Sequence, residues 1–149
     1  MSEISSGNTR KVEVVFSPAL FPVYFDNNDC TVVVIDVFRA TSAICAAFES
    51  GVDSLIPVAT LEEAIEYKQK GFKVGAERNA EIVEGFDFGN SPLTFKDGKF
   101  KNESLVLTTT NGTRAVEMAK SASKVVIGSF TNFSVLCDYR EKEDKDVLL

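Results

Sequence analysis

The chain has 149 residues, a hydrophobic fraction of 44% and a formal net charge of −6. This length suits one domain, and the acidic charge argues against nucleic acid as a partner, because phosphate backbones select basic surfaces. Residues 1–10 have neither a basic start nor an apolar stretch, so we interpret them as a disordered tail and not as a signal peptide. No apolar run is long enough to span a bilayer, and the three cysteines form no CxxC pair. We therefore expect a cytoplasmic protein with reduced thiols and no membrane partner.

Patterns typical of strands and helices alternate along residues 11–149, which we expect to form a single domain. Short apolar runs typical of strands lie at 11–16, 31–36, 54–58, 73–77, 104–110 and 124–129. Helical patterns occupy most of the intervals, at 39–50, 60–70, 113–122 and 131–141. This order predicts an α/β fold of the three-layer α/β/α type, with a mostly parallel sheet covered by helices on both faces.

Two segments depart from this alternation. Residues 78–103 are rich in glycine, asparagine and aromatic residues, with a turn expected at Asp97-Gly98. So long a loop is either a surface excursion or a functional segment, and its composition does not separate these two interpretations. Residues 146–149 resemble the start of a buried strand. We therefore expect the chain to be truncated at its C-terminus, with part of the active site missing.

Polar residues follow the ends of several predicted strands, where open parallel sheets bind their ligands. Three of the five arginines, Arg39, Arg78 and Arg114, are among them. A guanidinium holds a carboxylate, phosphate or sulfonate through two parallel hydrogen bonds. Any one of these arginines could equally pair with a nearby carboxylate or cap a helix. Taken together, they favour a site for a ligand with several anionic groups.

The stretch Thr-Thr-Thr-Asn-Gly-Thr at 108–113 lies between a predicted strand and a predicted helix, and we interpret it as an anion-binding loop. Gly112 lets the backbone approach a ligand closely, and the following helix directs free N–H groups toward it. The hydroxyl groups of Thr110 and Thr113 could add further donors. The alternative is an ordinary capped helix after strand threonines, but this run is longer than a cap needs.

Asp36 ends an otherwise apolar strand, so its carboxylate must be hydrogen-bonded, paired or metal-bound. Asp36 and Glu77 together could hold Mg²⁺, which prefers carboxylate and phosphate oxygens. Pairing of Asp36 with Arg39 is the structural alternative. The chain has no histidine and no GxxxxGK[ST] motif, which excludes a Ser-His-Asp triad and a P-loop. Metal-assisted chemistry on an anionic substrate remains.

Six short motifs occur in order along the chain: VIDVFRAT at 34–41, IPVAT at 56–60, GAER at 75–78, FDFGNSP at 86–92, TTTNGTR at 108–114 and GSFTN at 128–132. Together they resemble the magnesium-dependent 2-phosphosulfolactate phosphatases, over nearly the whole chain from about residue 12 onward. The family resemblance implies an α/β/α fold and a homo-oligomer. It also implies that members continue well past residue 149, and that their further acidic residues could supply metal ligands.

The same resemblance implies hydrolysis of 2-phospho-3-sulfolactate to 3-sulfolactate and phosphate, a step of coenzyme M biosynthesis. In this interpretation Asp36, Arg39 and Glu77 are catalytic, and Asp36 and Glu77 hold Mg²⁺. The expected substrate-binding residues are Arg78, Asn90, Ser91, Thr110, Asn111, Gly112, Thr113, Arg114, Ser129 and Asn132. The substrate is a small phosphoester with three anionic groups, which agrees with the three arginines.

Several alternatives stay open from the sequence. Asp36 could hold the metal during direct hydrolysis, or act as a nucleophile and form an aspartyl-phosphate. The protein could instead be a non-catalytic sensor or binding module for a small, multiply anionic metabolite. It could also be a structural fragment without activity.

Overall fold

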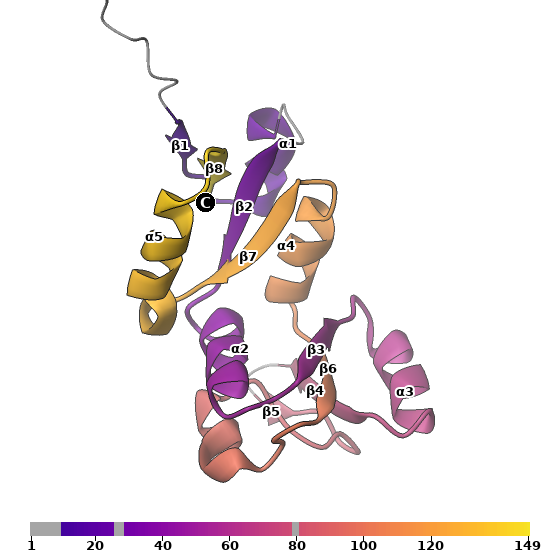
Figure 1. Cartoon of the computed structure of the whole chain (residues 1–149). Coiled ribbons are helices and arrows are strands. Elements are labelled where there is room, and N and C mark those ends of the chain that lie inside the picture. The colour runs from indigo at the N-terminus through magenta and orange to yellow at the C-terminus, as the bar shows by residue number, and fades with distance from the viewer. Residues whose placement is uncertain (1–9, 26–28, 79–80) are drawn as a thin grey trace, which may run out of the picture.

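The computed structural model describes residues 10–25, 29–78 and 81–149, whose strands form two sheets of four strands each (Figure 1). The first sheet contains, in spatial order, β1 (Val12–Glu13), β8 (Asp146–Leu148), β2 (Cys30–Ile35) and β7 (Lys124–Gly128), all paired in parallel. The second contains β3 (Ser54–Pro57), β6 (Ser104–Thr108), β4 (Lys73–Arg78) and β5 (Glu81–Ile82), of which only β5 is antiparallel to its neighbour.

Helices cover the sheets on both sides, which confirms the predicted three-layer α/β class. The α-helices are α1 (Phe21–Tyr24), α2 (Ala40–Glu49), α3 (Leu61–Gln69), α4 (Gly112–Ala119) and α5 (Phe133–Glu141). Three short 3-10 helices accompany them, η1 (Pro18–Leu20), η2 (Pro92–Gly98) and η3 (Phe130–Asn132). Among the described residues, no helix is long and apolar enough to cross a membrane.

The second sheet is buried on both faces. Successive residues of β6 pack into different clusters on its two sides. Leu105 and Leu107 pack against Ala43 and Ala47 of α2. Val106, between them, packs on the opposite face in a cluster that includes Ala64 of α3. Because successive side chains of a strand point to opposite faces, an unbroken apolar run marks a strand with helices on both sides.

The first sheet is covered in the same way. Val32 and Val34 of β2 pack with Ala119 of α4 and with the segment that contains α1. Leu136 of α5 lies on the other face, near Gly128, where Val33 of β2 also points. Figure 1 shows α4 and α5 on opposite sides of β2 and β7.

Two connections link the sheets through the middle of the molecule (Figure 1). One leaves β2 of the first sheet and enters α2, which packs on the second sheet. The other leaves β6 of the second sheet and enters α4, which packs on the first. The sequence predicted a mostly parallel sheet and its helices, but not this division of the strands between two sheets.

The irregular region 78–103 contributes to the core. Phe88, Phe95 and Phe100 are buried, and their ring centroids lie 5.2–6.0 Å apart. They pack against α2 on one face of the second sheet, so this part of the region belongs to the core and is not a surface excursion. The turn predicted at Asp97-Gly98 is confirmed, since both residues have positive φ angles of 65° and 67°.

Of the disordered tail predicted at residues 1–10, the structure describes only residue 10. Residues 1–9 lie outside the described residues. Arg10, which we assigned to the tail, donates hydrogen bonds to the carbonyl oxygens of Arg140, Glu141 and Glu143, the last at 2.8 Å. The predicted first strand is shortened to β1, and the sequence interpretation missed the helical turns at Pro18–Tyr24.

Asp87 provides a test of the packing of α3 on β4. Its Oδ2 accepts hydrogen bonds from Lys68 Nζ at 2.9 Å and from the Val74 N–H at 3.0 Å. Burial opposes ionisation of Asp87, but these bonds and the charges of Lys68 and Lys73 outweigh it and lower its pKa. The ionised side chain therefore stabilises the fold above its ordinary pKa of 3.8, and this contribution is lost as the pH falls through the lowered value.

We expect Asp87→Asn to destabilise the protein by about 0.5–1 kcal/mol at pH 7, since the charged pair is partly exposed. Urea unfolding of both proteins at pH 7 and at pH 2.5 measures this. The difference should shrink at the lower pH, where the wild-type carboxyl is losing its charge. A difference that is equal at both pH values would contradict the assigned cause.

Candidate functional site

The site predicted at the ends of the strands lies where the two connections come close together, at the starts of α2 and α4. Asp36 follows β2 directly and is half-buried. Its backbone is fixed by Thr41 of α2, which accepts a hydrogen bond from the Asp36 N–H at 3.1 Å and donates its own N–H to the Asp36 carbonyl at 2.9 Å. Burial raises the pKa of Asp36 above its ordinary value. Within the described residues its carboxylate forms no ion pair or hydrogen bond, so the charge is held there without a partner.

Gly112, the first residue of α4, brings the second connection against the first. A Cβ placed on Gly112 would lie 2.7 Å from Ala40 Cβ, 3.2 Å from Thr109 Oγ1 and 3.5 Å from Asp36 Oδ2. Only glycine therefore lets the start of α4 approach the start of α2 this closely. The Asp36 carboxylate consequently lies beside the positive end of a helix, where free N–H groups stabilise negative charge.

The loop before α4 combines internal bonds with exposed polar groups. The Thr113 N–H donates to Thr109 Oγ1 at 3.1 Å, and the Thr113 hydroxyl donates to the Thr109 carbonyl at 2.7 Å. The N–H and the hydroxyl group of Thr113 thus both bond within the loop. Thr110, Asn111 and Arg114 are exposed at its surface and remain available for a ligand.

Arg39 and Glu77 join the two sheets through an ion pair between Arg39 Nη2 and Glu77 Oε2. The backbone N–H of Asn90 donates to the same carboxylate oxygen at 3.1 Å. Arg78 donates from Nη1 to the carbonyl of Glu77 at 2.7 Å, so its guanidinium lies back along its own strand. The expected alternative pairing of Arg39 with Asp36 is wrong, because Arg39 pairs with Glu77.

Ser129 and Asn132 have a structural use that the sequence interpretation did not foresee. The Ser129 N–H donates to Asn132 Oδ1 at 2.8 Å, and Ser129 Oγ accepts from the Thr131 N–H at 3.2 Å, which together form a capping box around η3. Ser129 lies near the site, because its neighbour Gly128 pairs in register with Ile35 of β2. Ser91 precedes η2, and its carbonyl accepts from the Thr94 N–H at 3.0 Å.

Thr41 and Thr109 are the supporting residues that we did not assign to the site from sequence. Each fixes one of the two connections through hydrogen bonds to the backbone. Their position near a helix start after a buried strand is the sequence signal, since threonine there bonds to free backbone groups. Two polar atoms nearby, Asn90 Oδ1 and Thr108 Oγ1, are buried and have no hydrogen-bond partner in the described part of the chain.

Magnesium fits this site through Asp36. Residues 10–25, 29–78 and 81–149 contain no group of three or more His, Cys, Asp or Glu side chains that could hold a metal ion. Mg²⁺ does not need such a cage, because one or two carboxylates, substrate phosphate oxygens and water suffice. An unpaired carboxylate beside the start of a helix suits a cation that would be shared with the phosphate of a substrate.

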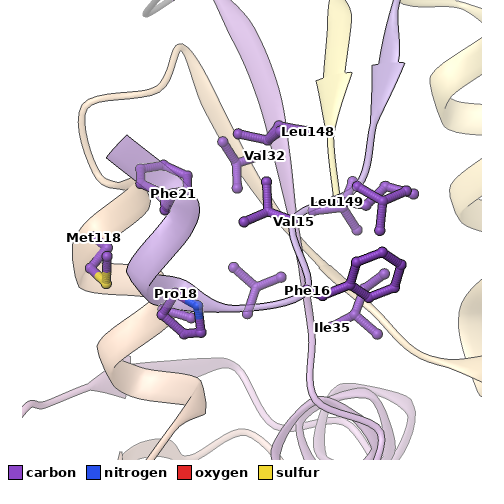
Figure 2. A pocket seen from close by; sticks show the side chains of 13 residues that line it. Val15, Phe16, Pro18, Phe21, Val32, Ile35, Met118, Leu148 and Leu149 are labelled. Carbon is purple, nitrogen blue, oxygen red and sulfur yellow. The ribbon is translucent and has the colours of Figure 1, made fainter. Parts of the chain in front are cut away.

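A large apolar cavity of about 400 Å³ lies away from the polar site, beside the first sheet. Figure 2 shows Phe16 next to Ile35, with Val15, Phe21 and Met118 around the same space. None of the thirteen side chains that line it is charged. An anionic ligand would lose its hydration there without gaining a partner, so this cavity is excluded as its binding site.

Comparison with known proteins gives one family model and several relatives that match this chain. The family model described as 2-phosphosulpholactate phosphatase matches residues 15–149. Proteins named "Probable 2-phosphosulfolactate phosphatase" from Thermotoga maritima, Caldanaerobacter subterraneus and Clostridium novyi are 44%, 41% and 43% identical to this chain. These matches cover 93%, 83% and 80% of this chain but 58%, 53% and 52% of the relatives. The chain therefore spans little more than half the length of the curated relatives it matches.

Proposed function

Since the chain belongs to the 2-phosphosulfolactate phosphatase family, we propose that it takes part in hydrolysing a small phosphoester with several anionic groups. 2-Phospho-3-sulfolactate is the proposed substrate, and 3-sulfolactate and phosphate are the products. The observation that carries this proposal is the half-buried carboxylate of Asp36 beside Gly112, at the start of α4. A carboxylate that can hold a metal, next to free N–H groups that can hold a phosphate, suits metal-assisted phosphate hydrolysis.

In this proposal, different residues of the chain bind the phosphate, the other anionic groups and the metal. The free N–H groups at the start of α4 and the exposed loop residues Thr110 and Asn111 bind and orient the phosphate. Arg39 and Arg114, whose side chains reach the solvent, bind the other anionic groups. Asp36 would hold Mg²⁺, which when bound would neutralise the charge that develops on the phosphate oxygens.

Other parts of the proposal rest on the sequence interpretation and the family resemblance. They are the magnesium requirement, the place in coenzyme M biosynthesis, a cytoplasmic location and a homo-oligomeric state. Asp36 as nucleophile is the mechanistic alternative. It would leave a phosphoryl group on the protein, which the mass of the chain denatured during turnover would show.

Phosphate release from 2-phospho-3-sulfolactate tests the proposal, with magnesium present and with EDTA added. We expect release that EDTA stops and magnesium restores. Turnover that does not need a metal would overturn the magnesium role. Thermal stabilisation by 3-sulfolactate without any turnover would favour the binding module instead. Absence of both turnover and stabilisation would overturn the functional proposal for this chain.

A further inference from the structure

We propose that Glu77 is a positioning residue, which acts by holding the guanidinium of Arg39 in place for the substrate. This inference rests on the proposed function, and it gives Glu77 a role other than the metal ligation expected from the sequence. Three observations carry it: the ion pair with Arg39, the second bond from Asn90, and the confinement of the carboxylate by backbone.

The ion pair reaches from one sheet to the other. Arg39 lies on the connection from β2 to α2, and Glu77 lies in β4 of the second sheet. The Glu77 side chain is only 16% exposed, whereas that of Arg39 is 37% exposed. The carboxylate is thus the buried anchor, and the guanidinium is the part that still faces solvent.

Glu77 is itself held from a second side. The Asn90 N–H donates to Glu77 Oε2, the same oxygen that accepts from Arg39. A Cβ placed on the neighbouring Gly89 would lie 3.8 Å from this oxygen and 2.7 Å from Ile82 Cγ1, so the backbone passes close by. A carboxylate fixed in this way is a rigid support for a flexible side chain.

The guanidinium of Arg39 has further N–H donors that are not used by the ion pair. Only its Nη2 bonds to Glu77, and its other N–H groups have no hydrogen-bond partner among the described residues. A guanidinium held at one corner can present its remaining N–H groups to an anion with less loss of rotamer freedom on binding. Metal binding by Glu77 would have to use Oε1 alone, because Oε2 already accepts from Arg39 and Asn90, whereas both oxygens of Asp36 are unpaired among the described residues.

Binding of inorganic phosphate and of 3-sulfolactate tests this role without requiring turnover. We expect Glu77→Gln to weaken binding of both anions by roughly 5–10-fold, because Arg39 loses its orientation. The apparent affinity for Mg²⁺, measured as a thermal shift, should be unchanged. Where turnover is measurable, KM should rise more than kcat falls. Glu77→Gln combined with Arg39→Gln should bind no more weakly than Arg39→Gln alone, since both changes remove one function.

Asp87→Asn is the matched control, because it also removes an ion pair at the second sheet, but one whose partner, Lys68, lies on α3. It should lower stability and leave anion affinity unchanged. A Glu77→Gln variant with wild-type anion affinity would overturn the proposal, and so would one that loses Mg²⁺ affinity as Asp36→Asn is expected to. Wild-type protein that binds neither anion would overturn it as well. Anion binding that needs Glu77, without any turnover, would sustain this inference and defeat the proposed phosphatase activity.

Discussion

The Asp36→Asn variant is expected to release phosphate at least about 100-fold more slowly than the wild type, and yet to melt at a higher temperature. The loss of activity follows from the loss of the unpaired carboxylate at the proposed phosphate site. The gain in stability follows from burial, which raises the pKa of Asp36 and therefore makes its ionised form costly in the folded protein. Asparagine keeps the shape of the side chain without this charge.

The stability effect also has a defined dependence on pH. Because the folded pKa is raised, the ionised carboxylate destabilises the wild type at pH values above it. The difference in Tm between the two proteins should be largest near neutral pH and should shrink as the pH falls through the pKa of Asp36. Thermal denaturation at several pH values and phosphate release at pH 7 measure the two effects. A substitution that lowers activity but raises stability is typical of a residue that serves function at a cost in stability.

Asp53→Asn is a suitable control for this experiment, because Asp53 is an exposed aspartate that precedes β3. It should change neither the turnover nor the Tm appreciably. An Asp36→Asn variant that retains wild-type turnover would remove Asp36 from the mechanism. One that melts at a lower temperature would show that the carboxylate has a stabilising partner.

The sequence predicted the parts of the site that local patterns determine. The β-branched run before Asp36 marks a strand buried on both faces, and the rule for parallel sheets then places Asp36 at its carboxyl end. The same reasoning correctly placed Gly112 at a helix start. These conclusions need only the residues within one strand, one turn and one helix.

Long-range pairing could not be predicted in this way. β2 pairs with β7 and β8, whose residues lie about ninety to a hundred and twenty positions later in the chain, and hydrophobic periodicity contains no information about such partners. The division into two sheets was therefore invisible in the sequence. The pairing of Arg39 with Glu77 was missed for the same reason, since it joins residues 38 positions apart on different sheets.

Ser129 and Asn132 show why polar residues at strand ends are hard to assign from sequence. Ser129 and Asn132 have the spacing of a capping box, but with asparagine where glutamate or glutamine is usual. Their position after a strand favoured a ligand-binding interpretation. In the structure, the Asn132 side chain accepts from the Ser129 N–H and donates to the Ile127 carbonyl, and the Ser129 hydroxyl accepts from the Thr131 N–H. Polar residues at strand ends thus include groups that hold the loop as well as groups that are free to bind a ligand.

Gly112→Ala is expected to lower the free energy of unfolding by about 1–3 kcal/mol, because overpacking a closely packed contact costs that much. The new Cβ would meet Ala40 Cβ at 2.7 Å, and Ala40 cannot move without shifting the start of α2. Gly112 has no positive φ angle, so alanine is not strained by the backbone itself, and its better helix propensity should offset only a small part of the loss. Urea unfolding measures the effect. Phosphate release should fall too, because Asp36 lies 3.5 Å from the same position.

A second substitution separates this contact from a general disturbance of α4. Ala40→Gly removes the atom nearest to the new methyl group, so the Ala40→Gly, Gly112→Ala double variant should be more stable than the sum of the two single changes allows. Glu117→Ala, an exposed change on the same helix, should have little effect. Strict additivity of Ala40→Gly and Gly112→Ala would mean that the starts of α2 and α4 do not touch. The site could not then be the meeting point of the two connections, whereas a positive coupling would place Asp36, Ala40 and Gly112 in one packed junction.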